Sequence, residues 1–336
     1  MTGTRPDRRS VLQSALRLGA VAAASTLWRD GVLAQAAAWP GKALKIIVPY
    51  PSGGVTDAAT RLLAERLALV LGSPVVVDNK AGAGGLLGMD MVAKATDGHT
   101  LALAAISPLT LLPHLMHVPF DPLKDFSPIG TVMYSPVYVL ATPAFSGKRF
   151  DDIVTQAKAQ PGKLSMATSG VGSVGHVMLE QIKRKAGVDI VHIPYKGGGS
   201  QVIADAAGGH FELFTSNPSP NLNGLIAQGK LRVLAVTGPA RLSSLPEMPT
   251  LAELGHPLAN LTSLFGLFAP AKMPQDQVQR LNTELNKVLA QKDTQERLTK
   301  LDNVVTSGSP TQFQAIIQGE SAANARIVRE AGIRLE

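Results

Sequence analysis

The sequence predicts an α/β fold of two doubly wound domains joined by two crossovers. Three features carry this prediction: short apolar runs alternate with longer amphipathic segments, two extended apolar stretches interrupt the alternation, and the final helical segments have no strands of their own. Strand–helix alternation is typical of a largely parallel sheet covered by helices, because parallel strands need a long connection between them.

The first part of the chain shows this alternation clearly. Residues 44–49, 74–79 and 100–106 are short apolar runs bounded by turn residues, so we expect buried strands there. Between the first two runs, residues 56–72 place leucines on one helical face and end in a glycine. This pattern predicts a helix that covers one face of the sheet.

The alternation resumes after an extended stretch at 135–143. We expect helices at 150–162, 173–187 and 200–209, and a further helix that ends at Gly229. Each helix leads into an apolar run that we expect to be a strand. These strands are predicted at 163–169, 189–195, 211–214 and 230–237.

The C-terminal part of the sequence predicts a return to the first domain. A second extended stretch occupies 261–270, and helical segments follow at 274–302 and 310–332. Since these helices have no strands to cover, we expect them to pack on the first domain. The first domain is therefore predicted to contain residues 41–138 and 262–336, and the second 139–261, with a cleft between the two.

The N-terminus predicts export from the cytoplasm. Arg8 and Arg9 precede an apolar stretch, and Ala34 and Ala36 supply the small residues that a signal peptidase accepts. The stretch is too short to persist as a membrane span. We expect residues 1–36 to be a signal peptide cleaved near Ala36, and the mature protein to lie in the periplasm. The paired arginines favour the twin-arginine pathway, with the general secretory pathway as the alternative.

The composition excludes several kinds of site. The chain has no cysteine, which rules out disulfides, thiolate metal sites and a cysteine nucleophile. Removal of the predicted signal, with five Arg and two Asp, lowers the formal net charge from +7 to +4. Only 4% of the residues are aromatic and no run of Lys and Arg remains, so we expect no nucleic-acid partner.

Three glycine-rich loops follow predicted strands, at 48–57, 167–176 and 194–200. In open α/β sheets, ligands bind at the carboxyl ends of the strands. The unpaired N–H groups at a helix start bind anions without help from Arg or Lys. Such glycines can also serve only to make tight turns. Two such loops that face one cleft from opposite domains favour an anion site.

The second of these loops has the spacing of a dinucleotide-binding motif. Gly170, Gly172 and Gly175 follow the pattern G-x-G-x-x-G between a predicted strand and a predicted helix. The acid that would bind the ribose about 20 residues later is missing, since Tyr195 and Lys196 occupy that place. An exported NAD-dependent oxidoreductase therefore stays as the alternative function.

Catalytic and metal-binding groups have weak support in the sequence. Ser173 and His176 could share a helix face as a Ser–His pair, but this spacing at a helix start is more typical of an N-cap and a surface or core histidine. His114 and His117 have the spacing of a metal site without a third ligand nearby. We expect no catalytic residue, no metal and no cofactor.

Seven segments, in order along the chain, resemble the Bug receptors, the extracytoplasmic solute-binding proteins of the tripartite tricarboxylate transporter family. The resemblance implies a type II periplasmic-binding-protein architecture that closes on a carboxylate like a Venus flytrap. It implies a monomer that hands its ligand to membrane transporter subunits or to a sensor kinase. The segments are "LKIIVPYPSGGVTDAATRLLAERL", "GSPVVVDNKAGAGGLLGMDMVAKATDGHTL", "DPLKDFSPIG", "AKAQPGKLSMATSGVGSVGH", "VHIPYKGGGS", "GKLRVLAVTGPARLSSLPEMPTLAELG" and "FGLFAPAKMP".

The same resemblance implies that backbone amides and small hydroxyls of two facing loops hold the ligand carboxylate. The first loop would supply Tyr50, Ser52, Gly53, Gly54, Thr56 and Asp57, and the second Thr168, Ser169, Gly172, Ser173 and His176. The remaining candidate ligand-binding residues, which lie near other strand ends, are Ser107, Tyr195, Ser216 and Asn217.

The chain departs from the family pattern at three places that bear on the ligand. The strand "FELF" is followed by Thr215, Ser216 and Asn217 where the family often has an acid, which argues against an amino-acid ligand. The aromatic residue common near Leu264 is absent. The loop around Ser107 is more apolar than usual, which favours a ligand with a less polar distal end, such as an aromatic or branched carboxylate.

Overall fold

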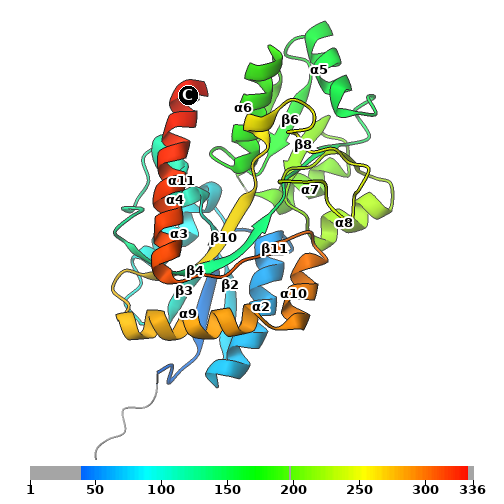
Figure 1. The fold of residues 1–336 in the computed structure, drawn as a ribbon. Coiled ribbons are helices and arrows are strands. Elements are labelled where there is room, and N and C mark those ends of the chain that lie inside the picture. Colours follow the sequence, from blue (N-terminus) through cyan, green and yellow to red (C-terminus); the bar gives the residue numbers. More distant parts are fainter. Residues whose placement is uncertain (1–38, 197, 332–336) are drawn as a thin grey trace, which may run out of the picture. The chain divides into compact units, whose positions relative to one another are not determined.

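Two β-sheets organise the chain in a computed structural model, which describes residues 39–196 and 198–331 (Figure 1). The predicted signal at 1–36 lies outside the described residues. Residues 42–196 and 198–331 belong to one compact unit. In the described part of the chain, no helix is both long and apolar enough to cross a membrane.

The first sheet has six strands in the order β11-β4-β10-β3-β1-β2. β1 pairs in parallel with β2 and β3, whereas β10 is antiparallel to both β3 and β4. β11 pairs antiparallel with the outer side of β4. The strands are β1 (Leu44–Val48), β2 (Val75–Asn79), β3 (Thr100–Ala105), β4 (Phe126–Ser135), β10 (Ser263–Pro270) and β11 (Val304–Val305).

Helices from both ends of the chain cover the first sheet (Figure 1). α9 and α11 pack against β4, and α2 packs against both β2 and α9. The segment at 274–302, expected as one helical segment, is divided into α9 and α10 because Gln291 has an extended backbone. The helices are α2 (Val55–Leu71), α3 (Leu86–Ala93), α4 (Ser107–Thr110), α9 (Gln275–Leu289), α10 (Lys292–Thr299) and α11 (Pro310–Ala331), with short 3-10 turns η1 (Ala83–Gly85) and η2 (Leu112–His114).

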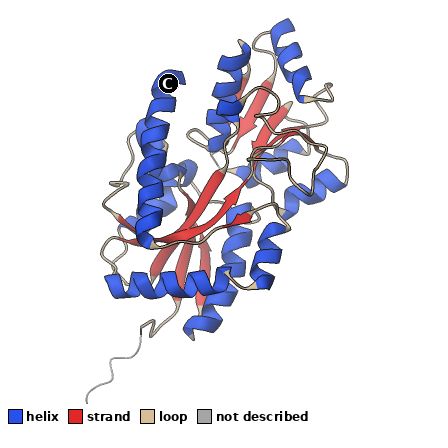
Figure 2. Cartoon of the chain, viewed as in Figure 1, coloured by secondary structure: helices blue, strands red, loops and turns tan. Residues whose placement is uncertain are grey.

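The second sheet has five strands in the order β7-β6-β8-β5-β9. β6 is parallel to β7 and β8, and β5 is antiparallel to β8 and β9. Helices flank this sheet as they do the first (Figure 2). Its elements are β5 (Tyr138–Ala141), α5 (Phe150–Ala159), β6 (Ser165–Thr168), α6 (Val174–Ala186), β7 (Val191–Pro194), α7 (Gly199–Ala206), β8 (Leu213–Ser216), α8 (Pro220–Ala227), β9 (Arg232–Ala235) and η3 (Pro257–Ala259).

The expectation of largely parallel sheets is wrong, because five of the nine pairings between strands in the described residues are antiparallel. The cause is the way the chain passes between the sheets. It leaves the first sheet through β4 and returns through β10, so these two neighbours run in opposite directions. β5, the first strand of the second sheet, likewise opposes β8 and β9.

β5 shows why the strands of this protein are continuous apolar runs. Val139 and Ala141 pack in a cluster on one side of the second sheet, while Tyr138 and Leu140 pack in a cluster on the other. All four side chains are at most 1% exposed. Because helices cover both faces, each residue along the strand is buried whichever way it points. Burial of each large apolar side chain contributes about 1.5–3 kcal/mol to stability.

Candidate ligand-binding site

A pocket is lined by residues from the strand ends and helix starts of both sheets. It encloses about 850 Å³, including open solvent at its mouth. This volume lies within the range of small-molecule sites. The first sheet contributes the loops after β1 and β3 and the strand β10, and the second contributes β8 and the starts of α6 and α7.

Four helices begin at this pocket. Their first turns bring Gly54–Thr56 of α2, Ser173–Gly175 of α6, Gly199 and Ser200 of α7, and Ser219 before α8 to the lining. The first N–H groups of a helix have no partner within the helix, and the helix dipole makes this end positive. No Asp, Glu, His, Lys or Arg side chain is among the lining residues. The pocket is therefore suited to an anion bound through main-chain N–H groups.

The loop that follows β1 is held in place by a buried carboxylate. Asp57 is 5% exposed, and its Oδ2 accepts hydrogen bonds from the Gly53 N–H at 2.9 Å and the Arg61 Nε at 3.1 Å. Burial alone would raise the pKa of Asp57, but the hydrogen bonds from Arg61 and Gly53 outweigh it and leave the pKa lowered. Asp57 is therefore ionised and shapes the loop, and it is not among the residues that line the pocket.

No side chain caps the N-terminus of α2, whose N-cap is Gly54. Thr56 lies in the first turn and lines the pocket with only 4% of its surface exposed. Its hydroxyl has no hydrogen-bond partner among the described residues. This buried hydroxyl is thus available to a ligand.

The loop before α6 rests on a pair of histidines. The Ser173 hydroxyl caps α6 by accepting the His176 N–H at 3.2 Å, and the Gly172 N–H donates to His176 Nδ1 at 3.2 Å. His176 is 5% exposed and stacks on His192 with ring centroids 4.3 Å apart. Thr168 Oγ1 lies 2.8 Å from His192 Nε2. The interpretation of Ser173 as an N-cap is confirmed, and of the two positions left open for His176 the structure shows the core.

Burial lowers the pKa of both imidazoles below the usual value, to about 4 for His192. The positive charge of a protonated His176 would lower the pKa of His192 further. Both rings are therefore neutral near pH 7. The hydrogen bond from the Gly172 N–H requires the neutral tautomer of His176 in which Nε2 carries the proton and Nδ1 accepts.

The last glycine of the G-x-G-x-x-G motif has a packing role. A Cβ at Gly175 would lie 2.0 Å from Thr215 Oγ1, so the close approach of α6 to β8 requires glycine. Thr215 lines the pocket, is 2% exposed, and its hydroxyl has no hydrogen-bond partner in the described part of the chain. This is the second buried hydroxyl that faces the pocket without a partner.

The third glycine-rich loop meets the first. Ser200 Oγ, at the start of α7, donates to the Ser52 carbonyl oxygen at 3.0 Å. Tyr195 does not line the pocket, because its hydroxyl donates to Asp205 at 2.8 Å. Asn217 donates to the Pro136 carbonyl oxygen at 2.8 Å, and so ties the end of β8 to the segment between β4 and β5.

The structure brings about half of the predicted site residues to the pocket. Those that line it are Tyr50, Gly54, Thr56, Ser107, Ser169, Ser173, Ser216 and Asn217. The others shape the surrounding loops and are not in the lining: Ser52, Gly53, Asp57, Thr168, Gly172, His176 and Tyr195. Burial raises the pKa of Tyr50, against hydrogen bonds with the Ala105 backbone and Ser107, so its phenol is neutral.

Several lining residues were not predicted from the sequence. Ser200 belongs to the third glycine-rich loop, where the helix-start argument could have found it. Phe265 stands one residue after Leu264, so the pocket does have an aromatic wall. Thr215 and Ser263 come from strands whose pairing no local motif predicts, whereas Gly84 lies in η1 and Val137 lies between β4 and β5. The main unpredicted residues are Gly84, Val137, Ser200, Thr215, Ser263 and Phe265.

The described residues contain no group of three His, Cys, Asp or Glu side chains that could hold a metal ion. His114, half of the His114–His117 pair, has its Nε2 3.0 Å from Ser321 Oγ. The pair therefore lacks the third ligand that a metal site would need in this part of the chain.

The model of the tripartite tricarboxylate transporter family receptor matches residues 59–333. The chain belongs to this family. It is 35% identical over 301 residues to protein BugT of Bordetella pertussis, a match that covers 89% of this chain and 92% of BugT. The resemblance drawn from the seven segments is thus confirmed.

Solved structures of family receptors have the same fold. The periplasmic binding protein BugD is 31% identical with a TM-score of 0.83, over 89% of this chain and all of BugD. A Rhodopseudomonas palustris protein with adipate is 31% identical with a TM-score of 0.84, over 88% of this chain and 99% of that one. The predicted α/β architecture is confirmed, and membership in a family of solute-binding receptors excludes the oxidoreductase alternative.

Proposed function

We propose that this chain is a periplasmic receptor that captures a small carboxylate and presents it to the membrane subunits of a tripartite tricarboxylate-type transporter. One observation carries the proposal: four helix N-termini open into a pocket whose lining has no charged side chain. Such a pocket favours a carboxylate, because N–H groups and the positive ends of helix dipoles both stabilise negative charge.

The buried hydroxyls of Thr56 and Thr215 support the same ligand. Each faces the pocket and has no hydrogen-bond partner in the described residues, so a carboxylate oxygen would satisfy it. Hydrogen bonds to a charged group contribute about 1.5–3 kcal/mol each. A few of them, less the cost of ordering the ligand and the loops, are enough for micromolar binding. Similar receptors support this class of ligand, since one of them holds adipate.

We propose that the receptor closes on its ligand by movement of two domains, residues 41–138 with 262–336 and residues 139–261. Sheet membership supports these boundaries to within one residue, Tyr138, since β4 and β10 belong to the first sheet and β5 to β9 to the second. A carboxylate that contacts α2 on one side and α6 on the other would favour the closed state, because only that state provides both sets of donors.

We also propose that residues 1–36 are a signal peptide removed near Ala36, which places the receptor in the periplasm. The family relation to a periplasmic binding protein supports this location. Mass spectrometry of the protein recovered from the periplasm would show a mature chain that begins at residue 37. A full-length chain retained in the cytoplasm would contradict the proposal.

Thermal unfolding of the mature protein tests the proposed function. The panel contains mono-, di- and tricarboxylates, amino acids, aromatic acids and NAD(H), with the primary amide of each acid as its control. We expect one class of acid to raise the melting temperature, because a ligand that binds only the folded state stabilises it. The matching amide should have no effect. Stabilisation by NAD(H) alone, or by no acid, would contradict a carboxylate receptor.

A further inference from the structure

A second pocket adjoins the first and shares Ala105, Ser107, Val174 and Ser263 with it. It extends from the strand ends toward α11, which contributes Glu320 and Asn324 to its lining. Because four residues line both pockets, the second pocket is the compartment next to the helix N-termini. We take it as the space that receives the other end of a ligand whose carboxylate lies at those N-termini.

Half of the residues that line the second pocket are apolar, among them Leu111, Val177 and Leu264. The polar half includes Tyr134 of β4 and the two side chains from α11. Such walls suit the carbon chain of a ligand. The polar group at its far end would meet α11 and β4.

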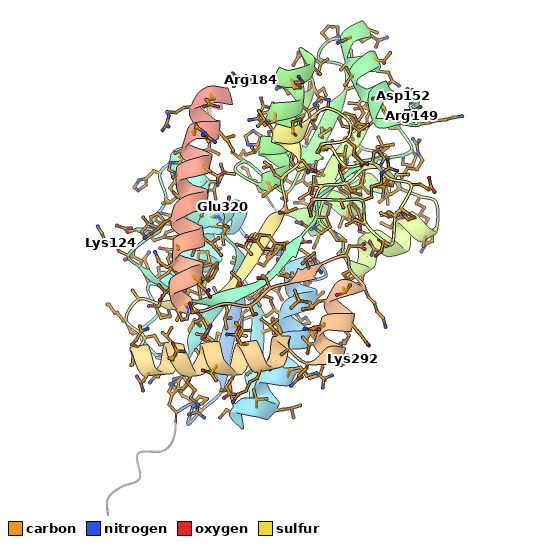
Figure 3. The ribbon with its side chains drawn as sticks, in the orientation of Figure 1. Lys124, Arg149, Asp152, Arg184, Lys292 and Glu320 are labelled. Atoms are coloured by element: carbon orange, nitrogen blue, oxygen red, sulfur yellow. The ribbon has the colours of Figure 1, made fainter. Side chains whose placement is uncertain are left out.

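Glu320 is labelled on α11 in Figure 3. It is the one residue with a charged side chain in the lining of either pocket. In the described residues, its carboxylate forms no ion pair and no hydrogen bond. The side chain is exposed at the mouth of the pocket, yet the surrounding protein desolvates the carboxylate enough to raise its pKa. Burial raises the pKa of Tyr134, and the negative charge of Glu320 raises it further.

Asn324, one helical turn beyond Glu320, also presents an acceptor. Its amide nitrogen donates to Thr110 Oγ1 at 3.3 Å, which leaves the amide oxygen without a partner in the described part of the chain. The end of the pocket at α11 thus offers two acceptors one turn apart. A ligand group there is stabilised if it donates hydrogen bonds, and a second carboxylate there is repelled by Glu320.

We propose that Glu320 selects ligands whose far end is a hydrogen-bond donor without negative charge, an ammonium or a hydroxyl group, and rejects dicarboxylates. This inference rests on the proposed function, because it assumes that the first carboxylate lies at the helix N-termini. It agrees with the absence of an acid after β8. An amino group next to the carboxylate would find no negatively charged side chain in the lining of the first pocket. An amino group at the far end of the ligand would meet the carboxylate of Glu320.

A matched series of straight-chain acids tests the proposal. Calorimetry on the mature protein would compare the ω-amino acid, the ω-hydroxy acid, the dicarboxylate and the plain monocarboxylate at each chain length from four to eight carbons. At the best-bound length, we expect the ω-amino or ω-hydroxy acid to bind at least tenfold more tightly than the dicarboxylate. The stronger of the two identifies the donor as ammonium or hydroxyl.

The variant Glu320→Gln tests whether this side chain causes the difference in affinity between the ω-amino acid and the dicarboxylate. We expect it to bind the dicarboxylate at least threefold more tightly than the wild type and the ω-amino acid at least threefold more weakly. Glu330→Gln is the control, because it removes the same charge from the same helix outside both linings. Unchanged ratios in Glu320→Gln, or a wild-type preference for the dicarboxylate, would overturn the role of Glu320. If no straight-chain acid binds but another acid of the thermal-unfolding panel does, the role of Glu320 is overturned and the proposed function stands. Failure of every acid in both experiments would overturn the proposed function as well.

Discussion

Ser173 has two tasks at the start of α6, since it caps the helix and lines the pocket. Thr56 has a single task, because its hydroxyl has no partner in the described residues and faces only the pocket. Single residues in this site therefore act through neutral hydrogen-bonding groups. Their contribution to ligand binding can be separated from their contribution to stability only with control variants that remove similar hydroxyl groups outside the pocket.

The double substitution Thr56→Ala with Ser173→Ala tests these hydroxyls. We expect the affinity for the acid selected by thermal unfolding to fall at least tenfold, about 1.4 kcal/mol, because a carboxylate would lose two donors. The control is Ser309→Ala with Thr283→Ala, which removes a hydroxyl that accepts a helix-start N–H and a helix hydroxyl outside the pocket. Equal affinity of wild type and double variant in calorimetry would refute the assignment of this site.

The stacked histidines predict a pH dependence of stability. His192 has a pKa of about 4 in the folded protein, below the value of about 6.5 in an unfolded chain. Between these values the unfolded chain binds a proton that the folded chain does not. The stability due to neutral His192 is therefore complete above pH 6.5 and is lost as the pH falls toward 4. We expect the melting temperature of wild type to fall more steeply over this range than that of His192→Gln; parallel curves would contradict the prediction.

Among the elements, the loop before α6 depends on a close approach to η2. Gly172 has a φ of +68°, and a Cβ there would lie 2.2 Å from Leu112 Cδ2. Both the left-handed backbone and the contact with Leu112 disfavour any side chain at this position. The loop that carries Ser173 can approach the first sheet only because residue 172 is glycine.

We expect Gly172→Ala to weaken carboxylate binding at least tenfold, because the added methyl group holds α6 away from η2. Leu112→Ala in the same chain should restore part of the affinity, since it removes the atoms that the methyl group meets. Gly224→Ala is the control, because a Cβ at Gly224 meets nothing within 4 Å. Affinity measured across this double-mutant cycle tests the contact; no recovery in the double variant would contradict it.

The elements themselves were largely predictable, because helices on both faces of each sheet make the strands continuous apolar runs. β4 was missed, since Pro128 and Gly130 interrupt its pattern. The starts of α2, α6 and α7 could be predicted from their glycine-rich loops. The places of Ser263 and Phe265 in the pocket lining could not be predicted. They depend on the pairing of β10 with β3 and β4, which joins segments far apart in the sequence.

In the molecule as a whole, contacts between the two sides of the pocket favour closure. Leu111 and Leu115, which follow β3, pack in one apolar cluster with Val177 of α6 and Val328 of α11. The bond between Ser200 and Ser52 adds a polar link. These contacts join the two sides of the pocket in the described structure.

Closure predicts a change in molecular size on binding. We expect the radius of gyration of the mature protein, measured by small-angle X-ray scattering, to decrease when the selected acid is added. The reason is that the empty receptor samples open states that the ligand disfavours. The matching primary amide should leave the scattering unchanged. A radius that is the same with and without a saturating acid would contradict closure.

The central claim is that main-chain N–H groups at helix starts hold the carboxylate. The most direct measurement is a nuclear magnetic resonance titration of the amide signals in ¹⁵N-labelled mature protein with the selected acid. We expect the largest downfield proton shifts at Gly54–Thr56 and at Ser173–Gly175, with smaller ones at Gly199 and Ser200, because amides that donate to a carboxylate are deshielded. If the acid binds while the signals of these amides keep their chemical shifts and other signals change, the carboxylate lies in another site and the account is wrong.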